Sequence, residues 1–523
     1  MVGPHAVDAK TLMTPIPLLA RIAVVASAAL MLCAPALWNG LPFFYPDTPT
    51  YLRGAQLVAD RLTPALTPAF GLVAQAATAT EVKHMTPETP MMPMKSPPTT
   101  RGLTSLDDKV VLAGRSVYYG ALLYGAQRAG SLWVAVGIQA LCLAAVLYLL
   151  MVRLWRVRPA LFLGTVGVLT LATPLAVYAD LLMPDVFAGV AILAFAALCV
   201  YWRQLAGVER GLLAGVLLFG LMAHASHVAV IAVLLGVALA LRRWNARWQG
   251  LSATALAVGG VCLTLAVGAE WAFAQGVQRA VGAAPLRLPY TTGRLIEMGP
   301  GTEFLRQHCA DAAVSGYAVC PLRANYPTTW DAFLFSADPA RGTFALVDAA
   351  TKRRIVSQQW QFIGDVIAHD PWGVLTGWVA DLGRQVIGFR VDVWSFGASQ
   401  LAMFEGRVPA QIFAAMQTSR GWNEPAYNRV LSTVTYASTL AALMLGAWWA
   451  WRRRAGAPAC VPQRLEQVAG LVIAGVGINA LVCATAASAL DRFQSRVIWL
   501  LPFLALAVLA LMWSRRTERR TAA

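Results

Sequence analysis

IAVVASAALMLCAPALW, residues 22–38, is an apolar run long enough to cross the hydrocarbon core of a bilayer with a little tilt. About nine further apolar segments follow it along the chain. The composition agrees, because 58% of the residues are hydrophobic, only 13% are charged and the mean hydropathy is +0.58. A soluble protein of this length is excluded by such a composition. We therefore predict an all-α polytopic membrane protein with about ten transmembrane helices.

The expected spans are approximately 18–38, 131–151, 159–179, 186–202, 210–223, 228–241, 251–272, 429–451, 466–487 and 495–513. Arginines gather in the short loops between alternate spans, which is the positive-inside pattern and predicts that both termini are cytoplasmic. The first span continues well past its small residues, so we expect an uncleaved anchor rather than a signal peptide. The net charge of +16 does not indicate nucleic-acid binding, because no basic stripe is interleaved with aromatic residues.

This topology divides the chain into three parts. Residues 1–272 form an N-terminal transmembrane module with a long outward loop at 39–130, residues 273–428 form an outward layer, and residues 429–523 form the last helices and a basic tail. Amphipathic patterns predict interfacial helices in both outward segments. Arginine greatly outnumbers lysine and alanine is abundant, a composition typical of a bacterial inner membrane with the outward segments on its periplasmic face.

Cysteine and methionine residues give two weaker signals. Cys309 and Cys320 share an outward segment with ten residues between them, and we predict a disulfide; the alternative, a metal site with His308, lacks a second pair of ligands. Residues 84–100, HMTPETPMMPMKSPPTT, are interpreted as a mobile insertion, with a soft-metal site on the thioethers as the alternative. No metal ligands are predicted elsewhere.

Ionisable residues of mixed type gather at the outward ends of the spans, whereas the cytoplasmic turns carry almost only arginine. Asp47 lies in PFFYPDTPTYL, residues 42–52, between Tyr45 and Tyr51. The others are Arg115, Asp180, Asp185, His224, His227, Asp491, Arg492 and Arg496. A site that needs a base and an anion clamp would use this mixture. Structural alternatives stay open: Asp47 and Asp180 as helix caps, the histidines as polar groups at a turn, and the arginines as headgroup anchors.

Three motifs, PFFYPDTPTYL, DLLMPDVFAG and DRFQSR, give the chain an arrangement that resembles the GT-C glycosyltransferases. These are polytopic enzymes that use polyprenyl-phosphate-linked sugars at the outward face of a membrane. The paired-acid form of the first-loop motif is absent, because Asp47 has no adjacent acid. This departure favours a single-base mechanism, while participation of a divalent cation stays open.

The resemblance implies an inverting transfer of a sugar from the carrier to a lipid, glycan or protein acceptor. It makes Asp47 the catalytic base. The substrate-binding residues that the resemblance implies are Tyr45, Tyr51, Arg115, Asp180, Asp185, Arg492 and Arg496. The arginines would hold the donor phosphate. Two other classes remain: a transporter or flippase for a lipid-linked substrate, and a non-catalytic scaffold of envelope assembly.

Overall fold

The computed structural model describes residues 17–62, 108–310, 316–336, 338–391, 401, 404–423, 426–455 and 462–522. Within these residues, six helices are long and apolar enough to cross a membrane: Trp133–Leu154, Ala225–Trp244, Ala253–Val281, Ala426–Arg454, Gln463–Ala486 and Asp491–Arg516. Shorter apolar helices cover Leu18–Leu32, Pro159–Ala172 and Val186–Tyr201. The fold is therefore that of an all-α membrane protein. The count of ten spans and the orientation stay predictions, and the stretch 84–100 lies outside the described residues.

The helices of the N-terminal part are α1 (Leu18–Leu32), α2 (Ala34–Asn39), α3 (Thr48–Leu62), α4 (Val117–Arg128), α5 (Trp133–Tyr148), α6 (Pro159–Ala172), α7 (Leu175–Asp180), α8 (Val186–Tyr201), α9 (Gly207–Ala223), α10 (Ala225–Trp244) and α11 (Ala253–Val281). A π-helical turn, Leu149–Leu154, continues α5, and a 3-10 turn, Ala246–Trp248, follows α10. The expected spans 18–38 and 159–179 are each divided into two helices. Pro35 and Pro174 lie at these breaks, where a residue without an N–H donor cannot continue the ladder of hydrogen bonds.

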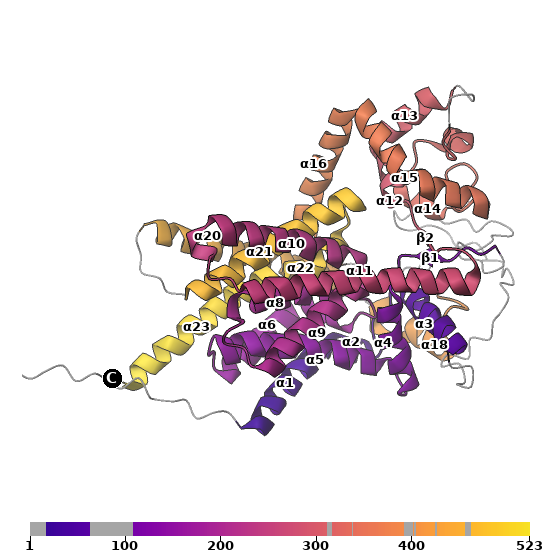
Figure 1. The fold of residues 1–523 in the computed structure, drawn as a ribbon. Helices are drawn as coiled ribbons and strands as arrows, with labels where there is room; N and C mark the ends of the chain where they lie inside the picture. Colours follow the sequence, from indigo (N-terminus) through magenta and orange to yellow (C-terminus); the bar gives the residue numbers. More distant parts are fainter. Residues whose placement is uncertain are drawn as a thin grey trace, which may run out of the picture.

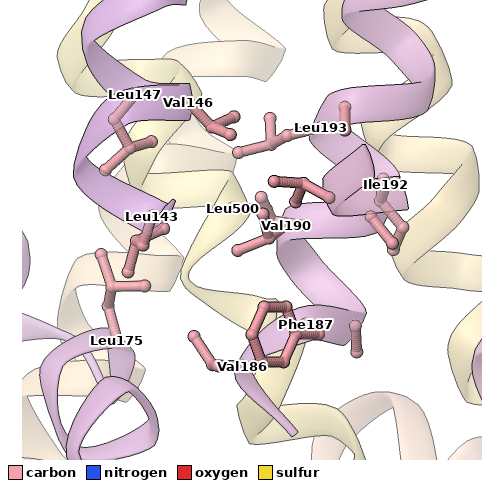
Figure 2. Packing of buried hydrophobic residues seen from close by; sticks show 14 of the residues in the cluster. Leu143, Val146, Leu147, Leu175, Val186, Phe187, Val190, Ile192, Leu193 and Leu500 are labelled. Atoms are coloured by element: carbon pink, nitrogen blue, oxygen red, sulfur yellow. The ribbon is translucent and has the colours of Figure 1, made fainter. Parts of the chain in front are cut away.

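Helix α8 is the centre of the bundle, and every one of its residues is buried. Its side chains pack against Leu143 and Leu147 of α5 and against Leu500 at the start of α23 (Leu500–Ala522) (Figure 2). Gly189 lets the backbone of α8 approach the indole of Trp499, since a Cβ there would lie 2.7 Å from the ring. Small residues at such crossings allow helices in a membrane to pack closely.

The C-terminal part contains α12 (Tyr290–Met298), α13 (Pro300–His308), a 3-10 turn (Cys320–Asn325), α14 (Trp330–Phe335), α15 (Ala349–His369), α16 (Pro371–Ile387), α18 (Ala410–Thr418), α19 (Arg420–Asn423), α20 (Ala426–Arg454), α21 (Gln463–Ala486), α22 (Asp491–Ile498) and α23. Helices α12 to α15 form a separate layer beside the end of the bundle, and α16 connects this layer to the bundle (Figure 1). Short parallel strands β1 (Leu112–Ala113) and β2 (Leu286–Arg287) join the two outward segments.

The layer has its own hydrophobic core, in which Phe304, Phe333 and Phe362 are buried. Cys309 and Cys320 are joined by the expected disulfide, with their Cα atoms 5.3 Å apart. The described residues Phe389, Val391, Leu401, Phe404, Val408 and Met416 pack instead into the core of the bundle, so the segment 273–428 contributes to two cores. The domain boundary at 428 stays a prediction.

Candidate functional site

The first outward loop is bonded to the hairpin that joins α7 to α8. The N–H of Phe43 donates to the carbonyl of Asp180 over 3.1 Å, and the N–H of Leu182 donates back to the carbonyl of Phe43 over 2.8 Å. The buried hydroxyl of Thr48 donates to the carbonyl of Leu182 over 3.0 Å and accepts from the N–H of Tyr45 over 3.0 Å. These bonds fix the PFFYPDT segment against the bundle. Sequence reasoning missed Thr48, although a threonine that opens a helix after an Asp is a local signal for it.

Asp47 forms an ion pair with Arg115, in which Nη2 lies 2.7 Å from Oδ1. The carbonyl of Asp47 also accepts from the N–H groups of Thr50 and Tyr51, so the residue begins α3 as well as carrying a charged side chain. The side chains of Asp47 and Arg115 are 25% and 24% exposed. Burial alone would lower the pKa of Arg115, but the adjacent carboxylate of Asp47 holds it above its usual value. This pair stays accessible from outside the protein.

A second ion pair lies deeper and joins the hairpin to the last helices. The carboxylate of Asp185 accepts from Arg492 at 2.8 and 3.3 Å, and Nη1 of Arg496 lies 3.6 Å from it. The guanidinium of Arg492 also lies over the ring of Tyr45, with its Cζ 3.9 Å from the ring centroid. The side chain of Asp185 is 1% exposed, and that of Arg496 is fully buried. Burial of two cations beside one anion requires these bonds, because an unpaired charge is costly away from water.

Polar groups from three helices surround Arg496. Its Nη2 donates to Ser226 Oγ over 3.0 Å and to Asn479 Oδ1 over 2.9 Å. His224 Nδ1 lies 2.8 Å from the same serine hydroxyl, and His227 Nδ1 donates to a backbone carbonyl of α9 over 2.8 Å. The part of the chain that the structure describes contains no group of three His, Cys, Asp or Glu residues that could hold a metal. Both histidines form hydrogen bonds at the turn between α9 and α10.

The hydroxyl of Tyr51 lies within electrostatic reach of both ion pairs. Tyr51 is buried with its ring edge-on to Tyr119, at a centroid distance of 5.2 Å. Its oxygen has no hydrogen-bond partner among the described residues, although it lies within the electrostatic reach of Asp47, Arg115, Asp185 and Arg492. Burial raises the pKa of the Tyr51 hydroxyl, so this group stays a neutral donor at physiological pH. A buried hydroxyl of this kind can still donate a hydrogen bond.

Asp180 faces away from this cluster. Its Oδ2 accepts from the N–H of Ala36 over 2.8 Å, in the first turn of α2, while Oδ1 has no partner among the described residues. Gln139 supports the hairpin beside it, because its amide donates to the carbonyls of Ala179 and Leu181 over 2.8 and 3.1 Å. Nothing in the local sequence around Gln139 signals this role, since a lone glutamine inside an apolar span has no distinctive pattern.

Two further arginines add positive charge at the start of α3, and Arg407 is the one within electrostatic reach of Asp47. Arg407, which lies just before α18, donates to Thr50 Oγ1 over 3.2 Å. Arg53, one turn into α3, is exposed and close enough to interact with Arg407 electrostatically. Sequence reasoning missed both residues, because Arg407 reaches the first loop from a segment more than three hundred residues away. The accessible carboxylate of Asp47 thus has Arg115 and Arg407 within electrostatic reach, and Arg53 lies close to Arg407.

The structure brings together seven of the eight residues that the sequence nominates, and it turns Asp180 toward α2 instead. The seven are Asp47, Tyr45, Tyr51, Arg115, Asp185, Arg492 and Arg496. No family model, curated protein or solved structure matches this chain. The geometry and chemistry of this cluster are therefore the basis for a functional assignment.

Proposed function

We propose that the chain is an inverting glycosyltransferase of the GT-C type, with ten spans, that works at the extracytoplasmic face of a bacterial inner membrane. It would move a sugar from a polyprenyl-phosphate carrier to a lipid, glycan or protein acceptor. The observation that carries the proposal is the difference between three acids. Asp185 is buried between two arginines and Asp180 is buried against α2, whereas Asp47 remains a quarter exposed. Asp47 is thus the acid of the three that a substrate can reach.

In the proposed reaction, a carboxylate oxygen of Asp47 accepts the proton of the acceptor hydroxyl. The oxygen of that hydroxyl forms a bond to the anomeric carbon while the bond from this carbon to the phosphate oxygen breaks, which inverts the configuration. The lipid phosphate leaves with the electron pair. Arg115, at 2.7 Å, orients the carboxylate that receives the proton.

The anionic leaving group needs cationic surroundings that a substrate can enter. Arg407, within electrostatic reach of Asp47, and Arg53, close to Arg407, are exposed, and with Arg115 they would hold the phosphate through charge-assisted hydrogen bonds. Arg492 and Arg496 are buried, which favours a positioning role: they hold Asp185 and the ring of Tyr45 in place. Tyr51 is as buried as these arginines, so its hydroxyl would donate only to a part of the substrate that enters the protein beside Asp47.

The position of the charges argues against a transporter. Transporters place ionisable residues near the bilayer midplane, at broken helices related by an internal repeat. In this chain the ion pairs of the cluster join residues near the N-terminal starts of helices α3, α4, α8 and α22. All four starts lie on the predicted outward side. A scaffold without activity does not need a reachable carboxylate paired with Arg115 and close to Arg407.

The test compares release of polyprenyl phosphate from a labelled polyprenyl-phosphate sugar by purified wild type and by Asp47→Asn, with and without EDTA. Glu270→Gln is the matched control, because it removes the acid of an exposed pair with Arg287 on the same side of the molecule. We expect turnover by wild type and control and none by Asp47→Asn at equal thermal stability. Turnover by Asp47→Asn at the wild-type rate would refute the role of the base. No turnover by any of the three proteins over a panel of donors would refute the enzyme.

A Tyr51→Phe variant tests the cluster independently. It keeps the ring that packs on Tyr119 and removes a hydroxyl that has no partner in the described residues. We expect stability close to that of wild type and a turnover lower by about tenfold, since a charge-assisted hydrogen bond is worth about 1.5 kcal/mol. Unchanged turnover would remove Tyr51 from the substrate site.

A further inference from the structure

A polar hollow lies at the far end of α10, on the side that the positive-inside rule assigns to the cytoplasm. It has a volume of about 540 Å³ and is lined by Leu239, Arg242, Arg243 and Gln249. Its donors are two guanidinium groups and one amide, and none of the lining residues carries a carboxylate. The hollow belongs to the opposite end of the helices from the Asp47 cluster, so the proposed reaction does not use it.

The two arginines of this hollow keep their charge available. Nε of Arg242 donates to the carbonyl of Leu251 over 2.9 Å, which orients the side chain and leaves its terminal nitrogens free of that bond. Neither Arg242 nor Arg243 forms an ion pair with an acid in the part of the chain that the structure covers. Other arginines on this side do have acids: Arg153 pairs with Glu209 at 3.2 Å, and Arg453 pairs with Glu466 at 3.4 Å.

The turn that closes the hollow is held by its own contacts. Asn245 Oδ1 accepts from the N–H of Arg247 over 3.1 Å, and the amide of Gln467 on α21 donates to the carbonyl of Arg247 over 2.6 Å. The ring of Trp248 packs on Gly470, where a Cβ would lie 2.6 Å from it. Arg242 and Arg243 lie in the last turn of α10 and Gln249 follows this ordered turn, so ligand binding does not need to order the backbone that carries the donors.

Apolar side chains beside the hollow are exposed. Leu239 is 48% exposed on a helix that is apolar enough to span a membrane, and Trp244 at the end of that helix is 79% exposed. Tryptophan is favoured at headgroup depth, and basic pockets between helices on the cytoplasmic side bind anionic headgroups. An occupant with a phosphate and acyl chains fits both the donors and the exposed apolar side chains.

We propose that this hollow binds the phosphate of an anionic lipid headgroup from the cytoplasmic leaflet, through Arg242, Arg243 and Gln249. The acyl chains of the lipid would lie along Leu239 of α10. The binding site is independent of the glycosyltransferase proposal, and it would stand if that proposal failed.

The test titrates the delipidated full-length protein, in neutral detergent, with fluorescent short-chain phosphatidylglycerol. The variant is Arg242→Gln/Arg243→Gln, and the matched control is Arg452→Gln/Arg454→Gln, which removes the same charge from the end of α20 outside the hollow. We expect the first variant to bind about 30-fold more weakly, at about fivefold per arginine, and the control to bind like wild type. Arg243→Gln alone, which spares the bond to Leu251, should bind about fivefold more weakly and covers the case in which the double variant fails to fold.

Three results would overturn the proposal. Equal binding by wild type and Arg243→Gln would show that the hollow is not the site. An equal loss in the Arg452→Gln/Arg454→Gln control would show a general effect of surface charge. Complete competition by inorganic phosphate, at the concentration at which unlabelled phosphatidylglycerol competes, would identify a site for soluble anions rather than for lipid. Competition by phosphatidylglycerol, with none by phosphatidylcholine or inorganic phosphate, is the result that supports it.

Discussion

Replacing Asp185 by Asn should destabilise the protein strongly, because it removes the one anion between two buried guanidinium groups. The carboxylate accepts two hydrogen bonds from Arg492 and lies 3.6 Å from Arg496, and the three side chains are at most 10% exposed. Removal of one partner from a buried ion pair costs about 3–5 kcal/mol, since the remaining charge is left unpaired. The Asn side chain has nearly the same shape as the Asp side chain, so the expected loss of stability does not include a cavity.

A double-mutant cycle separates the ion pair from the rest of the site. Arg492→Gln alone should also cost about 3 kcal/mol, because it leaves Asp185 with the longer contact to Arg496 and removes the cation from the ring of Tyr45. The variant that carries both changes has lost the charges of Asp185 and of Arg492 together, so neither is left buried without the other. Its loss should be smaller than the sum of the single losses by about 1–3 kcal/mol.

The assay is the free energy of unfolding in mixed micelles, titrated with SDS. Arg390→Gln is the matched control, because Arg390 pairs with Asp491 at 2.7 Å beside the same helix but is 71% exposed. A pair of that kind contributes about 0–1 kcal/mol. The reasoning is refuted if Asp185→Asn costs no more than Arg390→Gln, or if the two single losses add without any interaction energy.

Three further changes test the fold around the site. Thr48→Val should cost about 1–3 kcal/mol in thermal or SDS unfolding, because it leaves the carbonyl of Leu182 without its donor in a buried position. Gly189→Ala should cost about 1–3 kcal/mol in the same assay, since the new Cβ would lie 2.7 Å from the ring of Trp499. Replacing Cys309 by Ser should lower the stability of the outward layer by about 2–4 kcal/mol, measured as faster limited proteolysis, because the disulfide closes a loop of this layer.

Each of these changes has a control. Thr50→Val alters an exposed threonine in the same helix, and it should change stability by less than about 0.5 kcal/mol. Gly137→Ala adds a Cβ that meets nothing within 4 Å, and in the middle of α5 it should be neutral or stabilising by up to about 1 kcal/mol. Proteolysis of the Cys309 variant at the wild-type rate would mean that the layer's core holds without the disulfide.

The helical membrane fold could be predicted from the sequence, because long apolar runs admit few other structures in lipid. The gathering of Asp47, Arg115, Asp185 and Arg492 followed as well, since alternate ends of successive spans lie on one side of the membrane. The break between α1 and α2 is signalled by Pro35. A prediction based on the length of the apolar run nevertheless merges these two helices into one span.

The direction of each side chain was not predictable in the same way. Asp180 and Asp185 lie five residues apart in one hairpin, but one faces the backbone of α2 and the other faces Arg492. Local sequence gives the position of a residue along an element, while packing against distant segments decides which neighbour it meets. Arg407 illustrates the limit, because its contact with Thr50 joins segments with no shared pattern.

The pairing of Asp185 with Arg492 also has a consequence for how the protein is made. Asp47, Arg115 and Asp185 are synthesised early. Arg492 and Arg496, the buried cationic partners of Asp185, are added only with the last helices, α22 and α23. A chain that ends before Arg492 would contain most of the helices, but its Asp185 would have no arginine to pair with. We therefore expect chains truncated before Arg492 to be less stable than the full chain, because Asp185 lacks both of its arginines.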